Sequence, residues 1–471
     1  MSSTTTKTAP GRARTWSVQE HLDDILATVR PLEPIELQLL DAQGCVLVED
    51  VAVPLSLPPF PNSSMDGYAV RTADVTGASE EFPATLTVVG DAAAGLPAPP
   101  TVGPGQAVRI MTGAALPEGA DTVVPVEWTD GGTGGGPADR MTPHSAAPEG
   151  AGGPVRVFRP ATARAHVREA GSDVRAGDRA LDAGTVLGPP QLALLAAVGR
   201  GTVRVRPRPR VVVIATGSEL VQPGEPLGPG QIHDSNSFAL TAAARDAGAI
   251  AFRVGAVGDD AETFRATVED QLIRADLIVT SGGVSVGAYD VVKEALSGWT
   301  GDEALAEEDD DPTAYGAQDP TAGEQSETAA PDAPRSTGVD FRTLAMQPGK
   351  PQGFGTIGRD RTPVLTLPGN PVSAYVSFEL FVRPAIRALA GLTDLHRPAV
   401  RARLRTDKAL TSPDGRRQYL RGAYRDGTVE PVGGAGSHLV AALARADALI
   451  VVPEGTTSLE PGTEVDVIPL G

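Results

Sequence analysis

The sequence is poor in cysteine, in aromatic residues and in positive charge, and each shortage excludes a class of protein. Cys45 is the only cysteine among 471 residues, which excludes an intrachain disulfide and a thiolate zinc cluster. Aromatic residues make up 4% of the chain, and 54 glycines and 42 prolines favour small-residue α/β packing over a coiled coil. The net charge of −19 argues against nucleic acid or an anionic membrane surface as the main partner.

Long apolar runs are missing as well. A transmembrane helix needs about 18 apolar residues in succession, and no stretch of the sequence provides them. Residues 1–15 lack the apolar core of a signal peptide, and we expect them to form a disordered tail. Together with the single cysteine, these absences predict a cytoplasmic protein.

Two internal segments have the composition of irregular chain. Residues 129–153 are rich in glycine, and we expect a flexible insertion between two strands. Residues 302–332 contain 11 carboxylates and no lysine or arginine. We therefore expect residues 302–337 to form a disordered acidic insertion, with metal buffering or partner binding as the alternative role.

The remaining chain has enough apolar residues, 41% of the total, for three or four domains at roughly 100–200 residues each. A first helix is expected at 16–29, because Ser17 and Glu20 have the spacing of a capping box. Between 51 and 154 the apolar runs are short and β-branched, which predicts a mostly β domain. Residues 16–50 and 155–195 are interpreted as a linking domain.

From Arg210 onwards, predicted strands alternate with predicted helices. Strands are expected at 211–214, 252–257, 277–280, 341–346 and 364–367, and helices at 238–247, 261–275, 289–296 and 371–389. This alternation is typical of a doubly wound parallel sheet, which binds ligands beyond the carboxyl ends of its strands. The predicted fold is therefore α/β and multidomain, with this sheet at 196–396 and a β-barrel-like domain at 397–471.

Two loops that follow predicted strands have residues suited to chemistry. In the first, Gly217 permits a sharp turn and Glu219 supplies a carboxylate, although a capping or buried glutamate is the alternative. In the second, the sequence SGGVSVG at 281–287 offers backbone N–H groups and hydroxyls that suit a phosphate. Asp290 would then hold a divalent cation against that phosphate. Glycines also mark purely structural turns, so both interpretations stay open on these residues alone.

A third loop has the sequence LPGNPVS at 367–373. Asn370 suits the N-cap and Pro371 the first helical position, which already explains a helix start. Ser373 adds a hydroxyl in the first turn, where free N–H groups also favour anions. Lys350, in the turn PGKP at 348–351, adds a positive charge at the same edge, although an ordinary solvated lysine is the alternative.

Segments outside the sheet add polar groups whose roles the spacing alone does not define. Asp66 lies in a proline-flanked loop, and Thr112 lies in the mostly β domain. In the last domain, Arg416, Arg421 and the sequence GSH at 436–438 are interpreted as surface groups.

Six motifs in this order give the sequence its resemblance to a known family. They are MDGYAV (65–70), MTGA (111–114), TGSEL (216–220), SGGVSVG (281–287), PGKP (348–351) and LPGNPVS (367–373). Over residues 16–470 the chain resembles the molybdopterin molybdenumtransferases of MoeA and gephyrin E-domain type. The resemblance implies a molybdopterin-binding fold, and an enzyme that inserts molybdate into adenylylated molybdopterin and releases AMP. It also implies Mg²⁺, an elongated homodimer, and sites built from both subunits.

The resemblance assigns roles to individual residues by their motif positions. The implied catalytic residues are Asp66, Thr112, Asp173, Glu219, Asp290 and Lys350. The implied binding residues are Thr216, Gly217, Asp234, Ser281, Gly282, Gly283, Ser285, Pro351, Gly369, Asn370, Ser373, Arg416 and Ser437. Glu219 and Asp290 are the implied Mg²⁺ ligands, whereas Asp66 and Thr112 would reach in from the partner subunit. Lys350, Pro351, Ser373, Arg416 and Ser437 match the molybdate positions.

The sequence departs from the family pattern at two positions. Gln347 stands where the family often has a second lysine, which lowers the charge of the inferred molybdate pocket. Ser172 replaces the usual glutamate before Asp173 and weakens that assignment.

Two rival functions are a molybdopterin adenylyltransferase and a non-catalytic scaffold on the same fold. As partners we expect a molybdopterin adenylyltransferase and molybdoenzyme apoproteins or their chaperones, with neither nucleic acid nor membrane.

Overall fold

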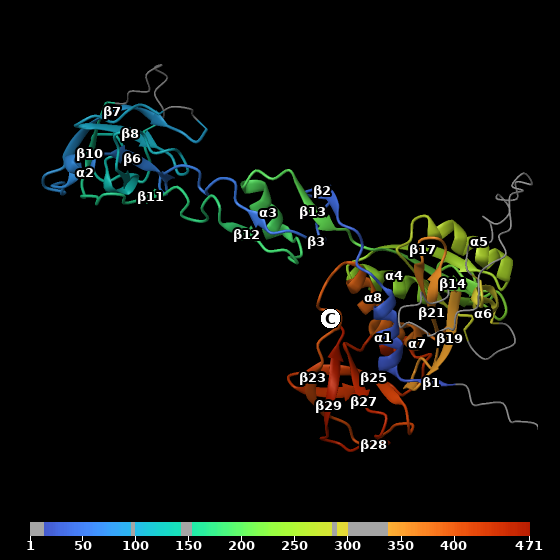
Figure 1. Cartoon of the computed structure of the whole chain (residues 1–471). Coiled ribbons are helices and arrows are strands. Elements are labelled where there is room, and N and C mark those ends of the chain that lie inside the picture. Colours follow the sequence, from blue (N-terminus) through green and yellow to red (C-terminus); the bar gives the residue numbers. More distant parts are fainter. Residues whose placement is uncertain (1–13, 96–98, 143–152, 285–289, 300–337) are drawn as a thin grey trace, which may run out of the picture. The chain divides into compact units, whose positions relative to one another are not determined.

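The computed structural model describes residues 14–95, 99–142, 153–284, 290–299 and 338–471 (Figure 1). The chain divides into two compact units. One contains residues 1–35, 44–46 and 205–471, and the other contains residues 36–43 and 47–204. The whole of the predicted acidic insertion, residues 302–337, and residues 1–13 of the predicted tail lie outside the described residues. Thr15, expected in that tail, belongs to a strand and pairs with Thr343.

A seven-stranded sheet forms the centre of the first unit. In spatial order it contains β1 (Thr15–Trp16), β19 (Gly338–Leu344), β21 (Pro351–Ile357), β22 (Thr362–Leu367), β18 (Leu277–Ser281), β14 (Arg210–Thr216) and β17 (Ile250–Val257). The last four strands are parallel, as predicted. The expectation of a wholly parallel sheet is wrong, because β21 runs antiparallel to both β19 and β22.

The unpredicted strand β21 contains Gly353 and Gly355, residues that ordinarily weaken a strand. Close packing requires the first of them. A Cβ on Gly353 would lie 2.2 Å from the Thr366 hydroxyl of the neighbouring strand. The glycines therefore mark an approach of two strands, and the resulting sheet is mixed but mainly parallel.

Helices cover both faces of this sheet. One face packs against α1 (Val18–Thr28), α4 (Asn236–Asp246), α7 (Pro371–Ser377) and α8 (Arg383–Leu389). The other face packs against α5 (Ala261–Leu272) and α6 (Val291–Leu296). Val211 and Val213 face the first layer, and Val212 and Ile214 face the second. This alternation is the period of two expected for a strand that is buried on both sides.

Local signals set the ends of these helices. Ser17 and Glu20 form the predicted capping box of α1, with each side chain bonded to the other residue's backbone N–H. The helix expected at 371–389 is interrupted by a π-helical stretch, η3 (Phe378–Val382). The helix therefore exists, but as three consecutive segments.

A closed barrel of five strands completes the first unit. Around the ring these are β25 (Arg417–Arg425), β26 (Thr428–Pro431), β23 (Val400–Leu404), β29 (Glu464–Pro469) and β27 (Ala448–Val452), which returns to β25. The predicted barrel-like domain is therefore confirmed. The strand β25 escaped prediction because arginines interrupt its apolar residues. The short elements β24 (Leu410–Thr411), β28 (Ser458–Leu459) and α9 (Val440–Leu443) lie in the same part of the chain.

The second unit contains the predicted mostly β domain. Its five-stranded sheet has the order β10 (Gly153–Val157), β7 (Ala84–Ala92), β8 (Gln106–Ile110), β6 (Gly67–Val70) and β9 (Thr122–Pro125). The second unit also contains the short elements β4 (Val51–Ala52), β5 (Asn62–Ser63), α2 (Thr72–Val75), η1 (Val126–Trp128), β11 (Val167–Arg168), β12 (Arg179–Leu181) and α3 (Pro189–Ala197). The strands β2 (Ile35–Gln38), β13 (Thr202–Arg206) and β3 (Val46–Leu47) form a separate three-stranded sheet. Tyr68 and Val155 are buried in the core of the five-stranded sheet.

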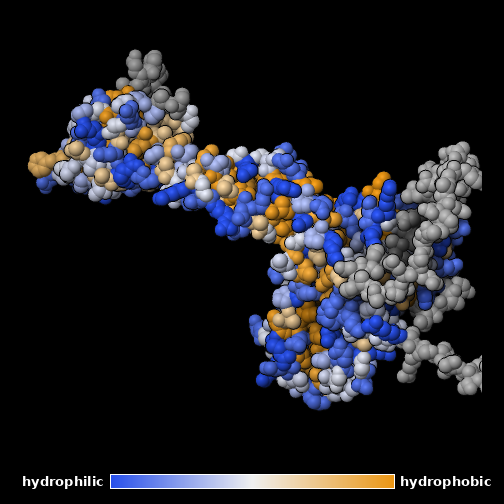
Figure 2. All heavy atoms as spheres, viewed as in Figure 1, coloured by the Kyte–Doolittle hydropathy of each residue, from blue (hydrophilic) through white to orange (hydrophobic). Residues whose placement is uncertain are grey.

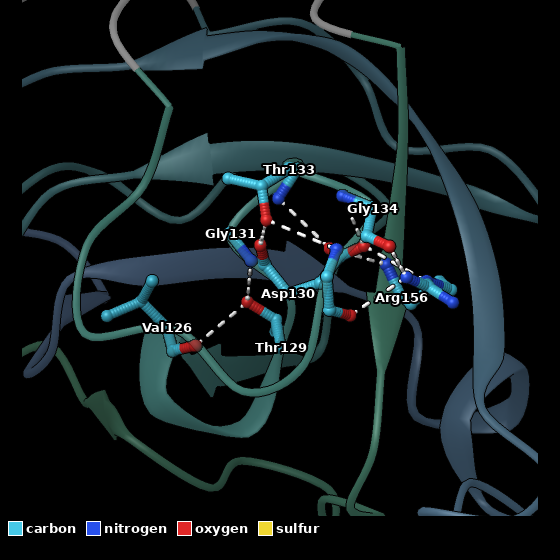
Figure 3. A network of polar contacts seen from close by, with 9 residues as sticks. Val126, Thr129, Asp130, Gly131, Thr133, Gly134 and Arg156 are labelled. Carbon is cyan, nitrogen blue, oxygen red and sulfur yellow. Dashed lines mark hydrogen bonds and ion pairs between the residues drawn. The ribbon is translucent and has the colours of Figure 1, made fainter.

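The part of the predicted flexible insertion that the structure describes, residues 129–142, contains an extensive polar network (Figure 3). The Asp130 side chain is buried, and each of its oxygens accepts two hydrogen bonds. Oδ1 accepts from the backbone N–H groups of Gly132 and Arg156, both at 3.0 Å. Oδ2 accepts from Gly134 N at 3.2 Å and from Arg156 Nε at 3.1 Å. Composition alone did not reveal this buried carboxylate, which bonds Gly132, Gly134 and Arg156.

The surface of the described residues is mainly polar. Figure 2 shows hydrophilic residues over much of the visible face, with hydrophobic residues in smaller patches. Among the described helices, none combines the length and the apolar character that crossing a membrane requires.

Candidate functional site

A cavity of about 810 Å³ opens in the first unit beyond the carboxyl ends of β14, β18 and β22. Fourteen of the residues singled out from the sequence line it. They are Thr216, Gly217, Glu219, Asp234, Ser281, Gly282, Gly283, Asp290, Lys350, Pro351, Gly369, Asn370, Ser373 and Ser437. Parallel strands that end at one edge of a sheet bring such loops together, as the alternation of strands and helices predicted.

The floor of the cavity consists of closely packed backbone. Gly282 has a φ of +102°, and a Cβ at this position would lie 2.5 Å from the carbonyl oxygen of Thr216. A Cβ on Gly369 would lie 3.5 Å from the Cα of Gly282. Only glycine can occupy position 282 without strain, because the loops after β14, β18 and β22 approach one another closely. Backbone at a cavity floor offers N–H donors to an anion.

The side chain of Asn236 joins two of these loops, although the sequence did not single it out. Its Nδ2 donates to the Ser281 hydroxyl at 2.8 Å and to the Gly369 carbonyl at 2.7 Å. The only sequence feature that could have pointed to Asn236 is its place in the segment IHDSN (232–236), two residues after Asp234. The nearby Thr216 hydroxyl is buried, and it has no hydrogen-bond partner among the described residues.

Asp234 lines the cavity, but its carboxylate bonds within the protein. The side chain is buried and accepts hydrogen bonds from the backbone N–H of Ser237 at 3.0 Å and from the Ser237 hydroxyl. The guanidinium of Arg253 lies 3.8 Å away. These contacts anchor the start of α4, whose first residue is Asn236. Asp234 therefore supports the cavity wall.

Two carboxylates suited to a cation also line the cavity. Glu219 is exposed in the loop after β14, next to β15 (Leu220–Val221). Asp259 and Ser218 hold this loop, because Ser218 N donates to the Asp259 carboxylate at 3.0 Å and Asp259 N donates to the Ser218 hydroxyl at 3.2 Å. Asp290 occupies the N-cap of α6 without a capping bond from its side chain. Its carboxylate is therefore not used to cap that helix.

The opposite wall carries groups suited to an oxyanion. Lys350 is exposed on the turn between β20 (Met346–Gln347) and β21, and Gln347 lines the cavity beside this turn. Ser373 lies in the first turn of α7 and is buried. The backbone N–H of Val372 donates to the carbonyl of Ser437 at 3.0 Å. A barrel loop therefore closes this side of the cavity.

Arg421 supports that barrel loop from below. It is 3% exposed and donates to the carbonyls of Val432 at 3.4 Å and Gly436 at 3.2 Å, and also to that of Gly434. Burial lowers the pKa of its guanidinium. The interpretation of Arg421 as a surface group is therefore wrong, since it holds the chain before Ser437.

Some expected residues are not brought to the cavity wall. Arg416 does not line it, and Ser285 lies outside the described residues. Asp66, Thr112 and Asp173 belong to the second unit. There Asp66 accepts hydrogen bonds from the Thr112 backbone N–H at 2.6 Å and from its hydroxyl at 2.9 Å. Further lining residues that the sequence did not single out for this site are His233, Ser235, Asn236, Asp259 and His438.

Comparisons with known families match nearly the whole chain. Residues 16–199 match the MoeA N-terminal region (domain I and II). Residues 403–470 match the MoeA C-terminal region (domain IV). Residues 212–318 and 316–388 match a probable molybdopterin binding domain. The similarity therefore covers both units and includes the loops around the cavity.

Individual relatives and a solved structure agree with these matches. The chain is 43% identical over 453 residues to molybdopterin molybdenumtransferase 2 of Mycobacterium tuberculosis, covering 96% of this chain and 98% of the relative. Molybdopterin molybdenumtransferase 1 of the same organism is 39% identical over 475 residues, with the same coverage. A molybdopterin biosynthesis MoeA protein from Pyrococcus horikoshii has a TM-score of 0.68 at 30% identity, over 97% of this chain and 100% of that one.

Proposed function

Because the chain belongs to the MoeA family of molybdopterin molybdenumtransferases, enzymes of molybdenum cofactor biosynthesis, we propose that its cavity binds adenylylated molybdopterin and molybdate side by side. The observation that carries the proposal is the meeting of three anion-suited loops at one edge of the sheet. In the proposed reaction, the two dithiolene thiols bind the molybdenum of molybdate, and one molybdate oxygen leaves as water with the two thiol protons. Another water cleaves the phosphoanhydride, AMP leaves, and molybdenum remains on the dithiolene. The whole-chain similarity to molybdenumtransferases favours this function over an adenylyltransferase or a scaffold.

The loop after β18 is the proposed phosphate and adenylate side. Gly283 and Ser281 line the cavity there, where the loop can offer a backbone N–H and a hydroxyl. The backbone N–H of Gly282 already donates to the Leu367 carbonyl at 3.1 Å. The buried Thr216 hydroxyl, which none of the residues placed in the structure bonds, is a further donor for a phosphate or ribose oxygen. These groups orient the adenylate and exclude water from its buried side.

The residues present fit Mg²⁺. The described part of the chain contains no group of three or more His, Cys, Asp or Glu side chains suited to a metal. Mg²⁺ does not need one, because it commonly uses one or two carboxylates with substrate phosphates and water. We propose that Glu219 and Asp290 hold it. When bound, Mg²⁺ would stabilise the charge that develops on the phosphate oxygens as the phosphoanhydride breaks.

The opposite wall is the proposed molybdate side. A tetrahedral dianion favours a cation and fixed N–H or hydroxyl donors. Lys350 supplies the cation, and Ser373 and Ser437 supply hydroxyls near the first turn of α7. Pro351 shapes the turn. Gln347 adds a neutral amide at this wall, where a lysine would add a second charge.

We also propose a homodimer in which Asp66, Thr112 and Asp173 complete the site of the partner subunit. Asp66 and Thr112 support this role because they form an exposed hydrogen-bonded pair within one chain. We further propose that the protein acts in the cytoplasm, as one step of a pathway. A molybdopterin adenylyltransferase would supply the substrate, and molybdoenzyme apoproteins or their chaperones would accept the product.

The molybdate side is tested by Lys350→Ala, measured as the affinity for molybdate by calorimetry with the pterin substrate present. Loss of one charge-assisted hydrogen bond, about 1.5–3 kcal/mol, weakens binding about tenfold to a hundredfold. Lys408→Ala is the matched control, because Lys408 is an exposed lysine that does not line the cavity. Equal molybdate affinity in both variants would remove Lys350 from the site.

A further inference from the structure

Three separate segments of the chain meet at the carboxamide of Asn236. Asn236 begins α4, and it donates to Ser281 at the end of β18 and to Gly369 after β22. On the proposed function, the loop at Ser281 faces the adenylate, and the loop at Gly369 leads to the molybdate side. We propose that Asn236 is a positioning residue that fixes the spacing between the two substrates.

The loops follow adjacent strands, in which Ser281 and Leu367 are register partners, and two further bonds between them are longer than those of Asn236. The backbone N–H of Gly282 donates to the Leu367 carbonyl at 3.1 Å, and the Ser281 hydroxyl reaches the Pro368 carbonyl at 3.4 Å. The Asn236 bonds, at 2.8 and 2.7 Å, are shorter than both and lie near the preferred hydrogen-bond distance. The carboxamide therefore adds a link from α4 to two loops that the pairing of β18 and β22 already brings side by side.

Buried neighbours on both sides of Asn236 hold this residue in place. Asp234, two residues earlier, is 1% exposed and bonds Ser237, the residue after Asn236. The carboxamide therefore projects from a fixed helix start. A group held in this way is preorganised, so the loop spacing that it sets does not depend on a bound ligand.

This arrangement has a kinetic consequence. A step between two bound substrates depends steeply on their spacing, and a misplacement of about 1 Å can cost about a hundredfold in rate. Binding of each substrate separately depends much less on that spacing. Loosening the link should therefore lower kcat and leave each KM nearly unchanged.

The test variant is Asn236→Asp. The carboxylate has nearly the same size, but it cannot donate a hydrogen bond and it repels the Gly369 carbonyl. We expect kcat for molybdate-dependent AMP release to fall about tenfold to a hundredfold, with both KM values within about twofold of wild type. Gln19→Glu is the control, because it makes the same chemical change in an exposed carboxamide on α1 that donates to Asp23 at 2.8 Å.

A double-mutant cycle separates positioning from a general effect on the fold. If Asn236 acts through Ser281, the losses caused by Asn236→Ala and Ser281→Ala should not be additive. The losses from Asn236→Ala and Lys350→Ala should be closer to additive. Hydrogen exchange should also accelerate in peptides covering 281–284 and 367–370 of the Asn236→Asp protein, while the thermal midpoint stays near that of wild type.

Several results would overturn the inference. An unchanged kcat together with unchanged exchange would show that Asn236 does not set the spacing. A raised KM at constant kcat would make it a substrate contact, and a lowered thermal midpoint with loss of all activity would make it a folding residue. If wild type itself releases no AMP, the proposed function fails separately. The exchange measurement still decides in that case whether Asn236 links the loops.

Discussion

Replacing Asp130 by asparagine should strongly destabilise the polar network of residues 129–142. Asparagine keeps one acceptor oxygen, but its NH₂ group then faces two donors. In either orientation, two of the four bonds to Gly132, Gly134 and Arg156 are lost. A hydrogen bond to a charged group contributes about 1.5–3 kcal/mol. Because the Arg156 side chain is 36% exposed, the lower value applies to each bond, and the expected loss is about 3 kcal/mol.

The assay is native-state hydrogen exchange read by mass spectrometry on peptides that cover residues 122–142. A loss of about 3 kcal/mol corresponds to exchange about 150-fold faster in the protected amides. Asp139→Asn is the control in the same segment, because Asp139 is 87% exposed and its contact with Arg140 is 3.4 Å long. Equal exchange in both variants would refute the assignment of Asp130 as the anchor of this segment.

The pKa of Asp130 determines how the difference in exchange rate between wild type and Asp130→Asn depends on pH. Burial disfavours its charge, but bonds from the Arg156 and Gly132 backbone and from the Arg156 guanidinium outweigh burial and lower the pKa below the usual 3.8. A lowered pKa in the folded state means that the ionised group stabilises the fold above about pH 3.8. The difference in exchange rate between wild type and Asp130→Asn should therefore persist at neutral pH and shrink as the pH falls below that value. A gap that grows in acid would contradict this reasoning.

Three further substitutions test the cavity. Asp290→Asn should abolish adenylate hydrolysis and leave the thermal midpoint unchanged, whereas undiminished AMP release would exclude Asp290 from the reaction. Gln347→Lys should tighten molybdate binding by adding a positive charge at the cavity wall, and a flat titration would place residue 347 outside the oxyanion pocket. Gly282→Ala should cost about 1–3 kcal/mol in urea unfolding, because its φ of +102° and a Cβ 2.5 Å from a carbonyl oxygen impose strain. Gly434→Ala, where a Cβ meets nothing within 4 Å, should cost clearly less, and an equal loss would refute the strain.

The strands of the central sheet that carry the cavity were predictable because their residues form continuous apolar runs. Val211–Ile214 and Leu277–Thr280 are buried on both faces, so hydrophobicity alone identified them. The strand β21 did not have this signal, because glycines at 353 and 355 permit a close approach that depends on the neighbouring strand. In the strand β25, arginines at 417, 421 and 425 interrupt the apolar residues, and its pairing with β27 closes the barrel.

Sequence reasoning predicted the convergence of loops that follow strands, and it missed side chains that act across loops. The loops containing Glu219, Gly282 and Ser373 all follow strands or start helices, so their convergence followed from topology. Asn236 was missed as a structural support, because its partners are 45 and 133 residues away in sequence. Arg421 was also missed, since its partners lie 11 to 15 residues further along the chain, after the next strand. No local spacing reveals such a contact.

The most direct test of the central claim is AMP release by the purified protein given adenylylated molybdopterin and Mg²⁺, with and without molybdate. The metal-loaded product is measured by reconstitution of a molybdoenzyme apoprotein. The proposed function predicts molybdate-dependent AMP release together with active cofactor, and loss of both in Asp290→Asn. Binding of the pterin substrate without AMP release, or release that yields no active cofactor, would contradict it.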